Sequence, residues 1–212
     1  MRELRLSNGW TQAELAKRAG YSERLIGKAE SGLPIARDTI ADIADALSES
    51  AQSRVYWEDL ACDPVQLAWK YLEALHDYQA DAIDYMRPFL AEDVVVIVAG
   101  DPEKFPFAGK HVGIEEVDRI YKVFFSIMEA PQTPAYQDCY QVIAQGANAV
   151  IWGESWIHPI GHPIKTPVRF NKKLTFRRGK LIQIEDCFDT ATGLDCMRGE
   201  LSESPGPQGE VN

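Results

Sequence analysis

The sequence contains little cysteine and no long apolar run. Its four cysteines have neither Cys-x-x-Cys nor zinc-ligand spacing, and they are Cys62, Cys139, Cys187 and Cys196. No stretch reaches the roughly 18 apolar residues of a membrane-spanning helix, and the first residues do not resemble a signal peptide. We therefore expect reduced thiols in a cytoplasmic protein with no membrane partner.

Basic residues are also scarce, because 22 Lys and Arg stand against 32 Asp and Glu, for a net charge of −10. The deficit is uneven along the chain. Residues 1–37 carry seven basic and four acidic side chains, a net charge of +3. Local charge sets the field that a phosphate meets, so the N-terminal end can bind nucleic acid although the whole chain is acidic.

The first 50 residues show the signals of short helices joined by a tight turn. Thr11 and Glu14 form a Thr-x-x-Glu capping box, which predicts a helix from Gln12. Gly20 suits a left-handed helix end, and Ser22 suits the cap of a second helix. Two helices joined in this way form the unit that places its second helix in the major groove of DNA.

With Ile40, Ile43 and Leu47 at helical spacing further on, the run from Thr11 to Leu47 resembles the helix-turn-helix domain of the lambda repressor/Cro/Xre family. The resemblance implies that duplex DNA is a partner.

Mapped onto this sequence, the resemblance assigns seven residues to the DNA interface. Arg24 and Lys28 can donate to guanine, and Glu23 can accept from a cytosine amino group. The positions expected to contact the phosphate backbone are Gln12, Lys17, Ser22 and Arg37. The alternative for each is a solvated helix face. Two positions depart from the family: Gly27 weakens the recognition helix by about 1 kcal/mol against alanine, and Ala36 replaces the usual hydroxyl cap of the fourth helix.

Composition changes divide the rest of the chain. Val55, Tyr56 and Trp57 make the segment after the helices too apolar for a free linker, so it should pack on a neighbour. The last residues are rich in Ser, Pro, Gly and Glu and have almost nothing to bury. The expected divisions are a helix-turn-helix domain at 1–50, a connector at 51–63, a second domain at 64–198 and a disordered tail at 199–212.

The sequence of the second domain predicts a mixture of helices and strands. Pro64 suits the start of an amphipathic helix, and the β-branched run 94–98 predicts a buried strand. The remaining expected elements are helices at 83–89 and 115–128 and strand-like stretches at 136–145, 148–158 and 168–189.

This order of elements is similar to the SnoaL-like branch of the nuclear-transport-factor-two-like family. Matching pieces are Phe107-Ala108-Gly109-Lys110-His111-Val112-Gly113 before a helix, the hairpin Arg178-Gly179-Lys180-Leu181, and the ending Asp186-Cys187-Phe188-Asp189. The resemblance spans nearly all of 64–195. It implies an all-α helix-turn-helix head and an α+β cone, in which a curved, mostly antiparallel sheet wraps on helices. It also implies a pocket at the open end and a homodimer formed through the C-terminal domain.

Side-chain pairing predicts the register of the last hairpin. A three-residue loop at 178–180 sets Lys172 opposite Asp186 and Lys173 opposite Glu185. A two-residue loop would set charged residues against apolar ones, so we expect the three-residue loop.

The face of this hairpin that holds Lys172 is expected to line the pocket. If the alternating residues of the preceding strand join it, the ligand-binding residues are Trp152, Glu154, Trp156, Phe170, Lys172, Asp186 and Phe188. Glu154 and Asp186 are the catalytic candidates, because an acid among aromatic rings has a raised pKa. The alternatives are ligand recognition, which pairing of Asp186 with Lys172 favours, and a polar cluster that only shapes the cavity.

The histidines do not predict a metal site, and no cofactor is expected. His158 and His162 flank a Pro-Ile-Gly loop, share no helix face and have no carboxylate or thiol nearby in sequence. His76 and His111 are single histidines, which we expect at the surface or at the rim of the pocket.

These features favour a DNA-binding transcriptional regulator whose C-terminal domain dimerises and binds a small apolar ligand. One alternative is an isomerase, cyclase or hydrolase with an autoregulatory DNA-binding head. The other is a dimerising scaffold whose cavity is packed and has no function.

Overall fold

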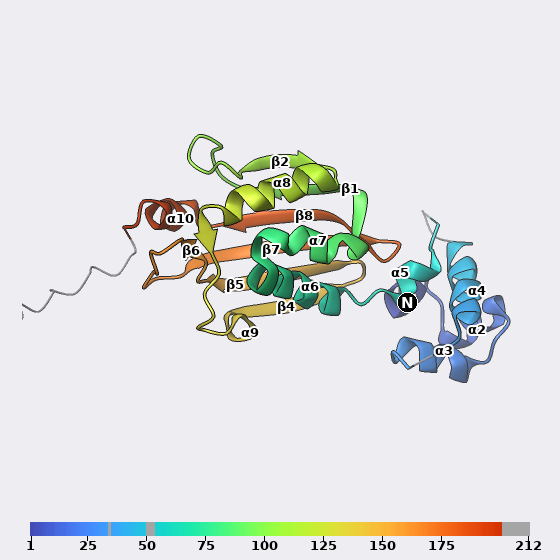
Figure 1. The fold of residues 1–212 in the computed structure, drawn as a ribbon. Coiled ribbons are helices and arrows are strands. Elements are labelled where there is room, and N and C mark those ends of the chain that lie inside the picture. The colour runs from blue at the N-terminus through green and yellow to red at the C-terminus, as the bar shows by residue number, and fades with distance from the viewer. Residues whose placement is uncertain (34, 50–53, 201–212) are drawn as a thin grey trace, which may run out of the picture. The chain divides into compact units, whose positions relative to one another are not determined.

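The computed structural model describes residues 1–33, 35–49 and 54–200, which fall into two compact units (Figure 1). The first unit holds residues 1–63 with segments 145–147 and 176–179, and the second holds the other residues from Pro64 on. Residues 1–63 are named the head here and residues 64–200 the cone. The expected end of the helix-turn-helix domain at residue 50 and most of the expected disordered tail lie outside the described residues.

The head consists of short helices whose predicted signals are confirmed. The described elements are α1 (Arg2–Ser7), α2 (Gln12–Ala19), α3 (Glu23–Glu30), α4 (Arg37–Ser48) and α5 (Trp57–Ala61). Thr11 and Glu14 form the capping box of α2, Gly20 has a φ of 75°, and Ser22 accepts from the backbone N–H of Leu25. Ala36 precedes α4 without a side-chain cap.

A small apolar core holds these helices together. Leu15, Ile26 and Ile43 are fully buried in it, on α2, α3 and α4. Val55 is buried in the same core, and Trp57 packs against it from α5. The apolar residues just before and within α5 therefore belong to the head's core, which explains why they are not a free linker.

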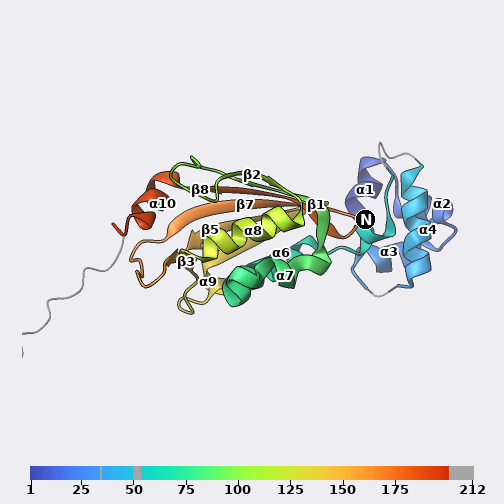
Figure 2. The ribbon, with the colours of Figure 1, turned by 45° about the horizontal axis from the view of Figure 1, so that its top comes forward.

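The cone has short and long helices, and they are α6 (Pro64–Glu73), a π-helix η1 (Ala74–Tyr78), η2 (Gln79–Asp81), α7 (Ala82–Met86), η3 (Arg87–Phe89), α8 (Ile114–Phe125), α9 (Tyr136–Cys139) and α10 (Thr190–Met197). The helix predicted from Pro64 therefore continues through η1. Helices α6, α7 and α8 lie against one side of a sheet, and α10 lies at one end of it (Figure 2). Tyr71, Leu72 and Ile83 are buried between these helices and the sheet.

The curved six-stranded sheet has the order β2-β1-β8-β7-β5-β4. Its strands are β1 (Leu90–Val98), β2 (Gly109–Val112), β4 (Tyr140–Gln145), β5 (Asn148–Ser155), β7 (Val168–Arg177) and β8 (Lys180–Phe188). Strands β1 and β8 run parallel, whereas β1 pairs with β2 and β5 with β7 in antiparallel fashion. A small second sheet pairs β3 (Met128–Glu129) with β6 (His158–Pro159). The expected α+β cone is confirmed.

The tip of the last hairpin differs from the prediction. Only Arg178 and Gly179 lie between β7 and β8, and both have positive φ, as a two-residue type I′ turn requires. The predicted three-residue loop is therefore wrong. The side-chain pairs deduced from it are nevertheless present. Leu181 and Ile184 are both buried although they are three residues apart, so the alternation of inward and outward side chains breaks between them. This break shifts the pairing by one residue and restores the predicted pairs.

Candidate functional site

The exposed side of α3 carries the residues assigned to base contacts. Glu23, Arg24 and Lys28 are exposed, while Ile26 on the opposite side is fully buried in the head's core. Arg24 and Lys28 are four residues apart, so they lie one above the other on the same face of the helix. Ser22 is exposed too, and its hydroxyl oxygen caps α3.

The remaining residues assigned to the DNA backbone have different environments. Lys17 is exposed on α2. The guanidinium of Arg37 lies 4.3 Å from the ring centroid of Trp57, which holds this cation at the start of α4. Gln12 is half-buried, and its amide donates to Glu30 over 2.8 Å.

A buried ion pair in the head was missed by sequence reasoning. Arg5 donates twice to Glu30, over 2.6 and 3.0 Å, and once to the carbonyl of Trp10. The side chains of Arg5 and Glu30 are only 7% and 4% exposed. Burial opposes ionisation of Glu30, but hydrogen bonds from Arg5 and Gln12 hold its pKa below the usual value. Arg5 and Glu30 are 25 residues apart, so no local sequence pattern indicates that they pair.

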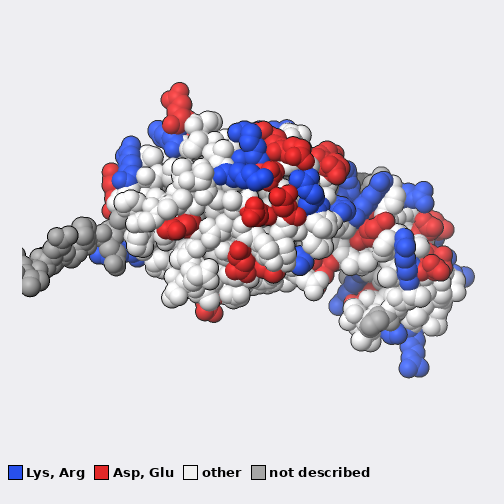
Figure 3. Space-filling view, viewed as in Figure 1, with Lys and Arg blue, Asp and Glu red and all other residues white. Residues whose placement is uncertain are grey.

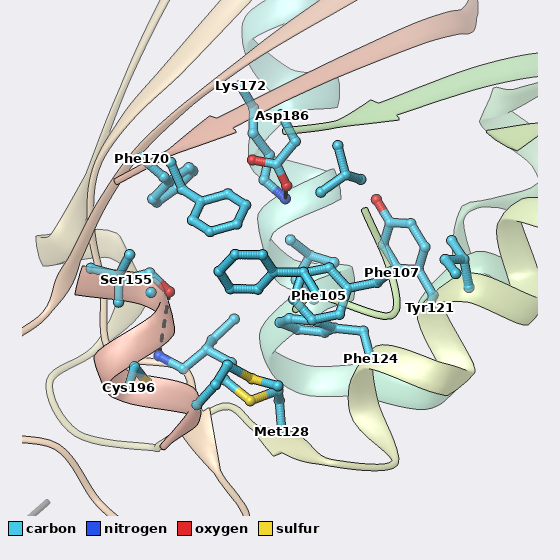
Figure 4. A pocket seen from close by; sticks show the side chains of 18 of the residues that line it. Phe105, Phe107, Tyr121, Phe124, Met128, Ser155, Phe170, Lys172, Asp186 and Cys196 are labelled. Atoms are coloured by element: carbon cyan, nitrogen blue, oxygen red, sulfur yellow. Dashed lines mark hydrogen bonds and ion pairs between the residues drawn. The ribbon is translucent and has the colours of Figure 1, made fainter. Parts of the chain in front are cut away.

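The cone has a partly open cavity of about 130 Å³ between its sheet and helices (Figure 4). The walls are mostly aromatic and aliphatic, and Phe107 and Phe124 meet edge to face with ring centroids 4.9 Å apart. Phe105 also packs edge to face on Phe188. An apolar cavity with a few convergent polar groups is the usual form of a small-molecule site.

One end of this cavity carries a buried network of polar groups. Lys172 Nζ lies 2.9 Å from Asp186 Oδ2 and donates to the hydroxyl of Tyr71 over 3.2 Å. The hydroxyls of Tyr71 and Tyr121 lie 2.5 Å apart. Burial opposes the charge on Lys172, but the carboxylate of Asp186 keeps its pKa above the usual value. Burial raises the pKa of both tyrosines, so their hydroxyls stay protonated.

Four of the seven predicted ligand-binding residues line the cavity, and they are Phe170, Lys172, Asp186 and Phe188. The expectation that Trp152, Glu154 and Trp156 join them is wrong. In the β5–β7 register Ile151 pairs with Lys172 and Gly153 with Phe170, so the odd-numbered residues of β5 face inward. Glu154 is exposed, with its carboxylate 3.9 Å from Arg169.

The sequence contained a signal for the correct face of β5. Exposure suits the charge of Glu154 better than a place among buried residues. Gly153 also allows the backbone at Cys139 to approach β5 closely, because a Cβ at position 153 would lie 2.1 Å from the carbonyl oxygen of Cys139. Ser155, on the inward face, lines the cavity, which the sequence analysis did not predict.

His76 and His111 are buried, so the expectation of surface or rim positions is wrong. His76 is 5% exposed, stacks on Tyr136, and lies 2.9 Å from the hydroxyl of Tyr140, which lines the cavity. Its Nδ1 has no hydrogen-bond partner among the described residues. Burial lowers the pKa of His76 to about 4, so it is neutral near pH 7. His111 contacts the carbonyl of Phe107 over 3.1 Å.

Neither histidines nor cysteines gather into a metal site in the described part of the chain. His158 is buried with Nδ1 3.6 Å from Glu129, whereas His162 is exposed. Cys196 lines the cavity, and burial raises the pKa of its thiol to about 11, which makes it a poor nucleophile. Within the same described part, no helix is both long and apolar enough to cross a membrane.

The outer face of the cone's sheet exposes apolar side chains at both edges. Val112 on β2 is 54% exposed and Ile143 on β4 is 58% exposed. The ion pair Lys173–Glu185 lies on the same face, between them. By contrast, the surface over α7 and α8 carries interleaved charges of both signs (Figure 3). The pairs there include Arg87–Glu115, Arg119–Glu116 and Lys122–Asp118.

Comparisons with known proteins separate the two parts of the chain. Residues 1–52 match the helix-turn-helix family model. The cone has the fold of nuclear-transport-factor-two-like (NTF2-like) proteins. An NTF2-like protein from Burkholderia xenovorans is 18% identical, covers 69% of this chain and 96% of its own, and gives a TM-score of 0.50. A protein of cystatin-like fold from Xanthomonas campestris is 15% identical, covers 64% and 97%, and also gives 0.50. No curated protein matches the chain.

Proposed function

We propose that this protein is a cytoplasmic, DNA-binding transcriptional regulator. The head binds duplex DNA through α3, and the cone forms a homodimer and binds a small, largely apolar molecule. The observation that carries the proposal is the joining, in one chain, of a helix-turn-helix with exposed cations on its second helix to a cone with an apolar cavity.

The DNA-binding part rests on the exposed groups of α3. Arg24 and Lys28 are suited to guanine, Glu23 is suited to the cytosine amino group, and Ser22 with Lys17 is suited to phosphate. Gln12 and Arg37 would reach phosphate from fixed positions, because each already has a partner within the head. Fixed side chains lose less conformational entropy on binding.

The dimer supplies a second head. Helix-turn-helix proteins of this kind bind two half-sites about 34 Å apart, so one head alone covers half of an operator. The outer face of the sheet is the proposed contact, because Val112 and Ile143 expose apolar surface there.

The cavity is better suited to recognition than to proton transfer. The catalytic candidate Glu154 lies outside it, and Asp186 is paired with Lys172. Burial keeps Tyr121 protonated and raises the pKa of Tyr140 to about 12, so neither phenol is poised as a base near pH 7. A ligand sensor is therefore favoured over the isomerase, cyclase or hydrolase alternative.

The DNA-binding part is tested by selecting genomic fragments that bind the full chain and retesting them with Arg24→Ala. Loss of a bidentate base contact should weaken binding to the selected site by about 1 to 3 kcal/mol and relax its selectivity. The matched control is Arg54→Ala, an exposed arginine outside the helix-turn-helix. Equal binding by wild type and Arg24→Ala would contradict the assignment of α3 as the recognition helix.

The dimer is tested by sedimentation of the full chain carrying Val112→Glu and Ile143→Glu. Charges of like sign on a self-complementary face repel, so this variant should shift toward the monomer. Ile160→Glu is the matched control, because Ile160 is 52% exposed but lies on a turn after β6. If the variant remains as dimeric as the wild type, the interface does not lie on this face of the sheet.

A further inference from the structure

The charged side chains that line the cone's cavity are concentrated at one end. Figure 4 shows Lys172 and Asp186 pointing toward one another, while Met128 and Cys196 lie at the other end of the view with phenylalanine rings between. A ligand that fills this space therefore meets a donor and an acceptor side by side at one end and apolar groups elsewhere.

We propose that the cavity selects an uncharged, single-ring compound that carries one hydroxyl group, such as a simple phenol. This inference rests on the proposed ligand-binding function and specifies its ligand class.

The size of the cavity matches about one ring. Its volume is about 130 Å³. An apolar cavity of about 150 Å³ in another protein holds one benzene molecule, so a single ring fills this space and a fused polycyclic compound would extend beyond it. Phe105, Phe107 and Phe124 line the space, and aromatic walls favour a flat ring by stacked or edge-to-face contacts.

The polar end is complementary to a hydroxyl group. An ammonium has three N–H donors, and Lys172 directs them to Asp186 Oδ2 and to the hydroxyl of Tyr71, which leaves one donor. The second oxygen of the Asp186 carboxylate has no hydrogen-bond partner among the described residues. A ligand hydroxyl can accept from Lys172 and donate to Asp186 at the same time. A carbonyl group can only accept.

Charge argues against an anionic ligand. Lys172 and Asp186 are 13% and 17% exposed and together neutral. A carboxylate ligand would add an uncompensated negative charge beside Asp186 in an apolar cavity, which is costly. A hydrocarbon ring would cause no such repulsion, but it would form no hydrogen bond with either group.

The test is calorimetric titration of the full-length protein with p-cresol, toluene and benzoate. These rings differ mainly in the polar group. A hydrogen bond to a charged group corresponds to about 10- to 100-fold in affinity, so p-cresol should bind that much more tightly than toluene and also more tightly than benzoate.

Variants locate the selectivity at the ion pair. The double variant Lys172→Met with Asp186→Leu removes both charges and should bind p-cresol and toluene with similar affinity. Arg87→Met with Glu115→Leu is the control, because this ion pair also belongs to the cone but lies on the surface over α7 and α8, away from the cavity and from the proposed dimer contact. It should keep the preference for p-cresol.

The outcomes separate the two claims. If wild type binds toluene as tightly as p-cresol, or benzoate more tightly, the inference of hydroxyl recognition is overturned while ligand binding stands. If none of the three compounds binds saturably, the proposed ligand-binding function fails with it. Because this comparison uses wild type, it does not depend on whether the variants fold.

Discussion

The head and the cone each contain an ion pair that is largely shielded from solvent, and the two pairs differ in what surrounds them. In the head, Arg5 and Glu30 are closed in by further hydrogen bonds from Gln12 and to the carbonyl of Trp10. In the cone, Lys172 and Asp186 border a cavity of about 130 Å³. The first pair has its hydrogen bonds within the protein, whereas the second keeps capacity for a ligand. The same chemistry therefore serves packing in one unit and, in our proposal, recognition in the other.

The largest predicted effect is the loss of stability when one partner is removed from each pair, and the size of this loss should differ between the two pairs. Arg5→Met leaves Glu30 buried without a cation, and such changes cost about 3 to 5 kcal/mol of the free energy of unfolding. Lys172→Met should cost less than this, because Asp186 is 17% exposed and solvent can reach it. Hydrogen exchange measures local stability in each unit of the same chain.

Double variants provide the control for this comparison. Arg5→Met with Glu30→Leu should recover most of the loss in the head, because no buried charge is left. Equal losses of stability in Arg5→Met and Lys172→Met would contradict the distinction between an ion pair surrounded by protein groups and one that borders a cavity.

Acid should lower the free energy of unfolding of the cone through His76, by slightly less than Arg5→Met lowers that of the head. Burial lowers the pKa of His76 from 6.5 to about 4, so the folded cone binds its proton less readily than the unfolded chain. The stability that this difference contributes is complete above pH 6.5 and is lost as the pH falls from 6.5 toward 4. The total loss is about 3 kcal/mol.

Urea unfolding at several pH values measures this loss. His76→Phe should flatten the pH dependence between 6.5 and 4, whereas His162→Phe should not, because His162 is exposed. An unchanged slope in His76→Phe would mean that other groups titrate in this range.

The smallest predicted effect is a gain in the head. Gly27→Ala should stabilise α3 by about 1 kcal/mol, because alanine is the better helix former. A Cβ at this position would meet Gln12 at 3.8 Å, an ordinary contact, so no clash offsets the gain. The measurement is the urea midpoint of the head. A loss of stability would show that α3 and α2 pack more closely than this distance indicates.

The head could be predicted in more detail than the cone because its signals are local. Thr11 with Glu14, Gly20 and Ser22 each act within four residues, and all appear as expected. The Arg5–Glu30 pair could not be deduced, because 25 residues separate its members.

In the cone, strand alternation shows which residues share a face but not which face is buried. The faces of β5 were therefore exchanged in the prediction, while Lys172 and Asp186 were placed correctly because opposite charges fix a cross-strand pair. Strand β2 and helix α10 were not predicted. For α10 a signal existed, since Asp189 caps it by accepting from Ala191 and Thr192.

If the protein is a ligand-responsive regulator, as proposed, the head should bind DNA differently when the cone's cavity is occupied. The most direct test measures the dissociation constant for a selected DNA fragment with and without saturating p-cresol. The same measurement is made on wild type and on Lys172→Met with Asp186→Leu. Allosteric coupling of 1 to 3 kcal/mol predicts a change of about 5- to 150-fold in wild type. The double variant should show a much smaller change. An unchanged dissociation constant in wild type whose cavity is filled would contradict a ligand-responsive regulator.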